Sequence, residues 1–138
     1  MRTYIASLVL TAAMALGFSG PAQADNFIPG HMVAERVVGN TVEGRYRSCA
    51  APRKDFFEHY KADGTFHGKE RTCGMAGSWD TYVGKWTVEE GRFCVYPGSD
   101  RQSGCFNYIE GEDGQLVRSG QTADSVEFVI VKGNPKNL

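Results

Sequence analysis

The stretch DFFEHYKADGTFHGKE, residues 55–70, decides the fold because it contains two aromatic-rich runs around one clear turn signal, Ala62-Asp63-Gly64. A three-residue loop with Gly64 in the left-handed conformation joins two antiparallel strands. This loop places three pairs opposite each other: Lys61 with Thr65, Tyr60 with Phe66, and His59 with His67. Phe56 then shares one face with Tyr60 and Phe66, and we assign that aromatic face to the core.

Similar runs rich in Val, Thr and aromatic residues fill the chain from Thr41 onward, separated by turns with Gly or Asp. They span residues 41–48, 55–61, 65–70, 77–89, 92–97, 105–110, 115–120 and 126–133. Regular spacing without a second helical pattern is typical of an all-β meander, here of about eight strands. Tight turns between consecutive strands predict a small up-and-down barrel or a strongly curled sheet.

The segment before these runs predicts one short helix. In HMVAERVVGN, residues 31–40, the residues Met32, Val33, Arg36 and Val37 have helical spacing, and Gly39-Asn40 ends the pattern. We expect this helix to plug one end of a barrel or to cover an open end of the sheet. The preceding DNFIPG, residues 25–30, predicts an extended and poorly fixed lead-in.

The first residues predict export of the protein. Arg2 is followed by an apolar run and by Ala22-Gln23-Ala24, which is typical of a signal-peptide cleavage site. We therefore assign residues 1–24 to a signal peptide and 25–138 to a single β-barrel domain, periplasmic or secreted, with no membrane span. The predicted mature chain has 14 Lys and Arg against 16 Asp and Glu, and this balance excludes a basic surface for nucleic acid.

All four cysteines lie in the predicted mature chain, so we expect two disulfides in an oxidising compartment. The run RFCVYPGSDRQSGCFNY reads as strand, polar loop and strand, which brings Cys94 opposite Cys105. Cys49 and Cys73 are then left for each other. Four cysteines allow three connectivities, and we favour this one.

His59 and His67 are the only constellation that resembles metal chemistry, since opposed strand positions bring two imidazoles together. A tight site needs a third ligand, and the hairpin offers none, so we expect a solvated pair on the outer face. A Gly-x-Ser-x-Gly motif is absent, and the acidic residues cluster in turn sequence. We therefore expect no catalytic residue, no cofactor and no enzyme.

Fourteen aromatic residues remain after the signal peptide, and many crowd the middle of the chain. They either fill the core or line a cup at a barrel mouth that binds a small apolar or amphipathic ligand. The candidate ligand-binding residues are Trp79, Tyr82, Trp86, Phe93 and Phe106. The alternative is a protein-binding module, such as an inhibitor of a secreted hydrolase or an envelope or host-interaction factor, which uses the loop PGSDRQSG and its Asp100 and Arg101.

A set of turn and core motifs resembles a known group: Gly39-Asn40-Thr41, Asp63-Gly64-Thr65, Gly84-x-Trp86, Gly91, Cys94 and Cys105. Together they resemble the uncharacterised secreted bacterial family called domain of unknown function 995, which is similar in pattern to small lipocalin-like barrels. The resemblance covers roughly residues 39–108. It implies a fold rather than an activity, because the family has no established catalytic residues.

Overall fold

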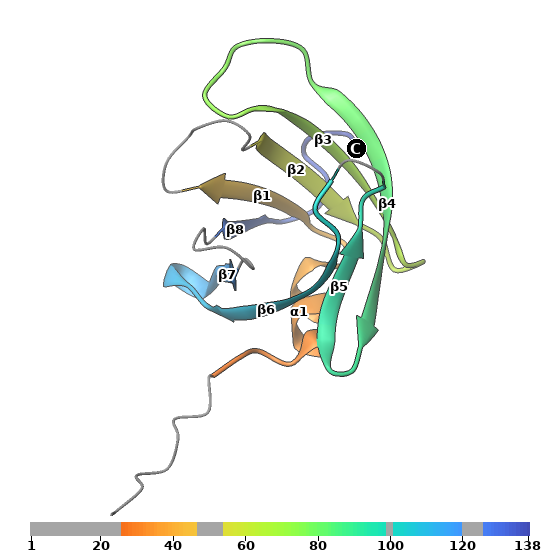
Figure 1. Cartoon of the computed structure of the whole chain (residues 1–138), viewed down its shortest axis with the longest axis vertical. Coiled ribbons are helices and arrows are strands. Elements are labelled where there is room, and N and C mark those ends of the chain that lie inside the picture. The colour runs from red at the N-terminus through yellow and green to blue at the C-terminus, as the bar shows by residue number, and fades with distance from the viewer. Residues whose placement is uncertain (1–25, 47–53, 99–100, 120–125) are drawn as a thin grey trace, which may run out of the picture.

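The computed structural model describes residues 26–46, 54–98, 101–119 and 126–138, and in these ranges eight antiparallel strands form a closed barrel (Figure 1). The elements in chain order are α1 (Gly30–Val37), β1 (Thr41–Tyr46), β2 (Lys54–Tyr60), β3 (Thr65–Thr72), β4 (Asp80–Glu89), β5 (Arg92–Tyr96), β6 (Gly104–Glu110), the 3-10 turn η1 (Glu112–Gly114), β7 (Leu116–Ser119) and β8 (Val126–Val131). Each strand pairs with its neighbours in sequence, and β1 also pairs with β8. The predicted all-β barrel with one short helix is confirmed.

The hairpin of β2 and β3 has the predicted register, with Tyr60 opposite Phe66 and His59 opposite His67. Gly64 has a φ of 86°, as the three-residue loop requires. The Asp63 carboxylate accepts hydrogen bonds from the Thr65 backbone N–H at 2.9 Å and from the Thr65 hydroxyl at 2.6 Å. The turn is therefore stabilised by its own polar residue, and the aromatic face points into the barrel.

Inward-facing side chains from all eight strands form the core. Rings contact one another around the barrel, for example Tyr60 with Phe66 at 4.9 Å and Tyr108 with Phe128 at 5.5 Å between centroids. The buried apolar residues of the core are Val33, Val37, Val42, Phe56, Tyr60, Phe66, Phe93, Val95, Phe106, Tyr108, Leu116, Val126 and Phe128. The aromatic content of the sequence thus fills much of the barrel interior.

Two strand glycines make room for large rings. A Cβ at Gly84 would lie 2.2 Å from the Phe66 ring, and one at Gly68 would lie 2.4 Å from the Tyr82 ring. Both distances are far below a van der Waals contact, so each ring lies directly over a glycine backbone. The two glycines therefore let the rings of Phe66 and Tyr82 pack directly on the backbone of the neighbouring strand, inside the barrel.

Helix α1 covers one end of the barrel, which was the first of the two positions that we expected for it. Val33 and Val37 are fully buried against the core, and the helix packs on β4 and β5. Arg36 forms an ion pair with Glu110 at the end of β6. The helix therefore contributes apolar residues to the core while its outer side is tied to a strand.

The predicted poorly fixed lead-in is wrong at Ile28. Its backbone N–H donates a hydrogen bond of 2.7 Å to the Tyr108 carbonyl, and its side chain packs against the core. Gly30 N–H also donates to the Gly91 carbonyl at 2.8 Å. Residues 26–29 lack regular secondary structure, but Ile28 is held against the barrel by its hydrogen bond to Tyr108 and by its side-chain packing.

The predicted disulfide between Cys94 and Cys105 is confirmed, with an S–S distance of 1.98 Å and the two residues opposite each other on β5 and β6. It is the one disulfide that the described residues hold, where we expected two. Cys49 lies outside the described residues, so its pairing with Cys73 stays a prediction; Cys73 is not a free thiol.

The predicted signal peptide, residues 1–24, also lies outside the described residues. Within the ranges that the structure describes, no helix has the length and apolar character needed to span a membrane.

Replacing both Cys94 and Cys105 by alanine should lower the free energy of unfolding by about 2 to 3 kcal/mol, because the disulfide shortens the open loop of the unfolded chain. Urea unfolding followed by fluorescence measures the difference. Thr81→Ala, at an exposed outer position of β4, serves as the control and should change stability far less. A double variant as stable as the wild type would contradict this role of the disulfide.

Candidate functional site

Two charged side chains are buried inside the barrel, Glu58 on β2 and Arg118 on β7, each with 7% of its surface exposed. Strand alternation explains their position, since Glu58 lies between Phe56 and Tyr60 on the inward face and Arg118 lies two residues after the buried Leu116. Burying a charge costs free energy unless a partner compensates it. The partners of these two groups therefore decide what the interior can do.

Glu58 has two hydrogen-bond donors. Its carboxylate accepts a bond of 2.6 Å from the Tyr60 hydroxyl and one of 2.8 Å from the Tyr82 hydroxyl. Tyr82 reaches it across Gly68, the position at which any Cβ would meet the tyrosine ring. Burial raises the pKa of Glu58, and the bonds from the two tyrosines, together with the charge of Arg118, act in the opposite direction.

Among the described residues, Arg118 has no carboxylate or carbonyl hydrogen-bond partner, and its polar neighbour is the Tyr108 hydroxyl. It lies opposite Tyr108 in the register of β6 and β7, and its guanidinium lies 4.6 Å from the ring centroid of Phe106 and 5.0 Å from that of Phe128. Among the described residues Arg118 forms no ion pair. The positive charge therefore rests on two aromatic rings without a carboxylate beside it.

The Tyr108 hydroxyl, next to Arg118, is also unsatisfied. Tyr108 is 1% exposed, and its buried oxygen makes no hydrogen bond of ordinary geometry in the described part of the chain. Burial raises the pKa of Tyr108, while the neighbouring Arg118 acts in the opposite direction. One wall of the barrel thus carries a cation and a hydroxyl, both with unused hydrogen-bonding capacity.

A second charged pair lies at the end of the barrel opposite α1, where β3 ends and β4 begins. Arg101 forms an ion pair with Glu70 at 3.1 Å, and its guanidinium lies 4.2 Å from the ring centroid of Tyr82. Both side chains are largely buried. Unlike Arg118, Arg101 therefore has its charge neutralised within the protein.

Four of the five predicted ligand-binding aromatics lie together on the barrel interior. Phe93 and Phe106 are buried, and Trp86 stacks on Phe93 at 5.6 Å between centroids. Tyr82 packs edge-on against Phe66 and holds Glu58. The structure therefore brings these rings together around the buried polar groups.

Trp79 lies elsewhere. It contacts Phe57 at 5.3 Å, and the Arg71 guanidinium lies 4.5 Å from its ring centroid. Phe57 alternates with the inward Phe56 and Glu58, so this contact is on the outer side of β2. Trp79 lies just before β4, which begins at Asp80, so it is not one of the inward-facing residues of that strand.

Sequence reasoning missed Glu58, Tyr108 and Arg118 as site residues. A signal for the first was present, because in the registered hairpin Glu58 lies on the same face as Phe56 and Tyr60. For Arg118 the same signal was present in a short strand, because Arg118 lies two residues after Leu116 and therefore on the same face. A charged residue at an inward position of an alternating strand is the feature that would have identified Glu58 and Arg118.

The predicted histidine pair lies on the outer side of the hairpin, as the register requires. His67 Nε2 is 3.2 Å from Lys61 Nζ, and His59 Nδ1 is 3.4 Å from the Thr41 hydroxyl. The neighbour of His67 is thus a lysine, which does not suit a metal site. The absence of metal binding stays a prediction.

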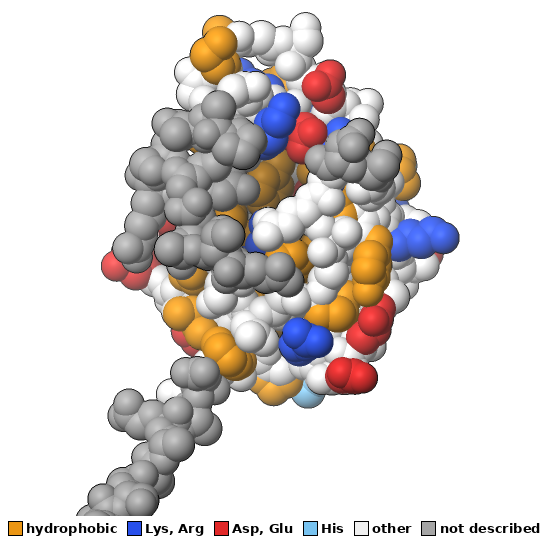
Figure 2. Space-filling view, in the orientation of Figure 1, with side chains coloured by type: hydrophobic (Ala, Val, Ile, Leu, Met, Phe, Trp, Pro, Cys, Tyr) orange, Lys and Arg blue, Asp and Glu red, His pale blue; other side chains and the backbone are white. Residues whose placement is uncertain are grey.

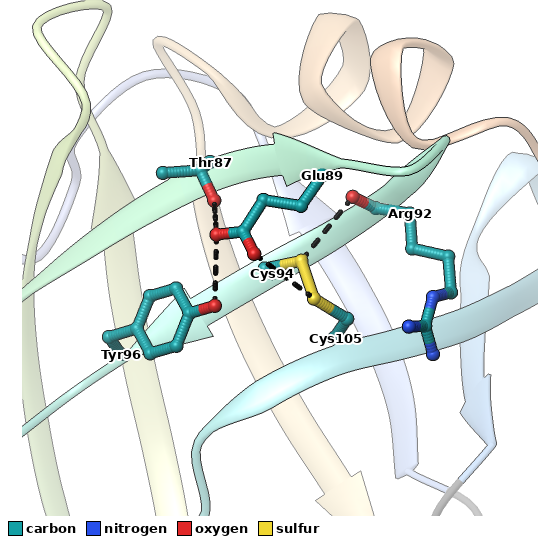
Figure 3. Close-up of a disulfide and its surroundings, with 6 residues drawn as sticks. All are labelled: Thr87, Glu89, Arg92, Cys94, Tyr96 and Cys105. Carbon is teal, nitrogen blue, oxygen red and sulfur yellow. Dashed lines mark hydrogen bonds between the residues drawn. A yellow bond between two sulfur atoms is a disulfide. The ribbon is translucent and has the colours of Figure 1, made fainter.

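Glu89, Cys94 and Cys105 form the one group of three potential metal ligands found within the described residues (Figure 3). The two sulfurs are bonded to each other, so neither is a thiolate that could bind a metal. The Glu89 carboxylate instead accepts hydrogen bonds from Thr87 at 2.5 Å and from Tyr96 at 2.9 Å, which lower its pKa. This group therefore stabilises the outer face of β4 to β6.

The buried Glu58 carboxylate should make stability depend on pH. Because its pKa is raised in the folded state, the folded protein holds this proton at pH values where the unfolded chain has lost it. Relative to Glu58→Gln, the wild type should therefore lose stability as the pH rises above the ordinary value of about 4.3. Urea unfolding of both proteins across this range measures the difference.

The control for this experiment is Glu127→Gln, at an exposed position of β8. Its difference from the wild type should change little with pH. A difference between the wild type and Glu58→Gln that stays constant with pH would contradict a raised pKa for Glu58.

Comparison with protein-family models, with curated proteins and with solved structures finds no match to this chain. The resemblance to domain of unknown function 995 therefore stays a prediction. The function has to be argued from the barrel and its interior groups alone.

Proposed function

We propose that this protein is a non-enzymatic, exported β-barrel that binds one small amphipathic molecule in the barrel interior. The observation that supports the proposal is the composition of that interior. Aromatic rings surround a set of buried polar groups, formed by Glu58, Arg118 and three tyrosine hydroxyls. A purely structural core of this size is filled by apolar side chains, because buried charges lower stability.

The shape of the molecule agrees with such a site. The face shown in Figure 2 is hollowed near its centre, and hydrophobic side chains are visible in the hollow. Small barrels that bind ligands hold them inside, with apolar walls and a few polar groups that fix the orientation. The four interior aromatics and the polar wall of β6 and β7 offer both kinds of contact.

The alternative function, a protein-binding module, depended on the loop between β5 and β6. Asp100 lies outside the described residues. Arg101 turns inward to Glu70 and Tyr82 instead of presenting its charge to a partner. The part of this loop that the structure describes therefore favours the ligand-binding function.

Titration with single-chain amphiphiles tests the proposal, using dodecanoic acid, dodecanol and dodecylamine below their micelle concentrations. At least one should bind saturably with one molecule per chain and change the tryptophan fluorescence. The chain has two tryptophans, Trp79 outside and Trp86 inside the barrel, which provide a matched pair. Trp86→Phe should abolish most of the fluorescence change, and Trp79→Phe should preserve it.

Native mass spectrometry of the protein purified from its own host complements the titration. A bound small molecule should add its mass to that of the chain. The proposal would be wrong if the host-purified protein carried no added mass and none of the three amphiphiles bound.

A further inference from the structure

The charge of Arg118 needs a partner that the described residues do not supply. A buried ion without a counterion lowers stability, and stacking of a guanidinium on aromatic rings offsets only part of that loss. Glu58 is the buried group of opposite charge, and the charge of Arg118 acts against the rise in its pKa that burial causes. Its two oxygens, however, already accept hydrogen bonds from Tyr60 and Tyr82.

Tyr108 adds a second unmet group at the same place. Its residue is directly opposite Arg118 on the paired strands, and its buried hydroxyl lacks a hydrogen bond of ordinary geometry. A buried hydroxyl without a hydrogen bond lowers stability. An anionic acceptor between the two side chains would satisfy both at once, because guanidinium and phenol groups each donate.

The number of charges in the interior limits the kind of anion. Arg118 is the one cation without a carboxylate partner among the buried residues described, because Arg101 is neutralised by Glu70. One unpaired cation matches a singly charged head group. A dianionic phosphate would carry one negative charge more than Arg118 can balance, in an interior that also contains Glu58. A cationic head group would be repelled by Arg118.

We infer that the interior site binds an amphipathic carboxylic acid, whose carboxylate accepts hydrogen bonds from Arg118 and Tyr108 and whose apolar part lies among the rings of the core. This inference rests on the proposed function and narrows it to one class of ligand. The rings of Phe106 and Phe128, which flank the guanidinium, provide the first apolar contacts beyond the head group.

The test compares ligands of equal chain length, dodecanoic acid, dodecanol and dodecyl phosphate, by calorimetric titration of the full chain. The wild type should bind the acid about 10- to 100-fold more tightly than the alcohol, the range expected for hydrogen bonds to a charged group. Arg118→Met should bind acid and alcohol equally. Tyr108→Phe, which keeps the ring, should lose a smaller part of the preference.

Lys85→Met is the matched control, because it makes the same kind of change on the exposed outer side of β4. It should keep the full preference for the acid. Thermal unfolding establishes that each variant is folded, and Arg118→Lys, which keeps the positive charge, should retain part of the preference.

The outcomes distinguish a failure of the inferred ligand class from a failure of the proposed function. Equal affinity of the wild type for acid and alcohol, unchanged in Arg118→Met, overturns the inference and leaves the proposed function standing. Tighter binding of the phosphate than of the carboxylate also overturns it. If none of the three amphiphiles binds, the inference fails. The proposed function fails with it if dodecylamine does not bind either and the host-purified protein carries no added mass.

Discussion

The pairing of β1 with β8 is the constraint on which the rest of the structure depends. It closes the sheet, so that half of the side chains on every strand face a common interior rather than solvent. An inward charge in a closed barrel has to find its partner inside. Glu58 accepts hydrogen bonds from two tyrosines there. Arg118 lies against two aromatic rings, and no carboxylate of the described residues pairs with it. Closure of the barrel therefore buries Glu58 and Arg118 in one interior, where they are the charged groups of the candidate site.

The two walls of the interior are built differently. On the side of β2 and β4, Gly68 lets Tyr82 approach Glu58, and the resulting polar group is complete within the protein. On the side of β6 and β7, Tyr108 and Arg118 are adjacent and incomplete. A satisfied polar cluster stabilises a unique core, whereas an unsatisfied one lowers stability unless something binds to it. This asymmetry explains why we assign the head group to β6 and β7.

The strand pattern and its turn residues could be predicted from the sequence because they depend on local chemistry. Asp63 and Gly64 fix the register of one hairpin, and Cys94 and Cys105 mark opposed positions of another. The interior site could not be predicted in the same way. That Arg118 lies against Phe106 and Phe128 depends on contacts among three different strands, and no local pattern specifies them.

The sequence placed Trp79 among the five candidate ligand-binding aromatics, and the structure separates it from the other four. It lies just before β4, outside the strict alternation of the strand, and packs on Phe57 on the outer side of the barrel. Ile28 shows the converse, because a segment with the composition of a free lead-in is fixed by one backbone hydrogen bond to Tyr108 and by core packing.

The central claim is that Arg118 is kept inside the barrel for a ligand and at a cost in stability. The most direct measurement is the free energy of unfolding of the wild type and of Arg118→Met, each with and without dodecanoic acid. Our account predicts that the variant without ligand is at least as stable as the wild type, and that the acid stabilises the wild type more than the variant. A variant that is several kcal/mol less stable without ligand, together with a wild type that the acid does not stabilise, would contradict it.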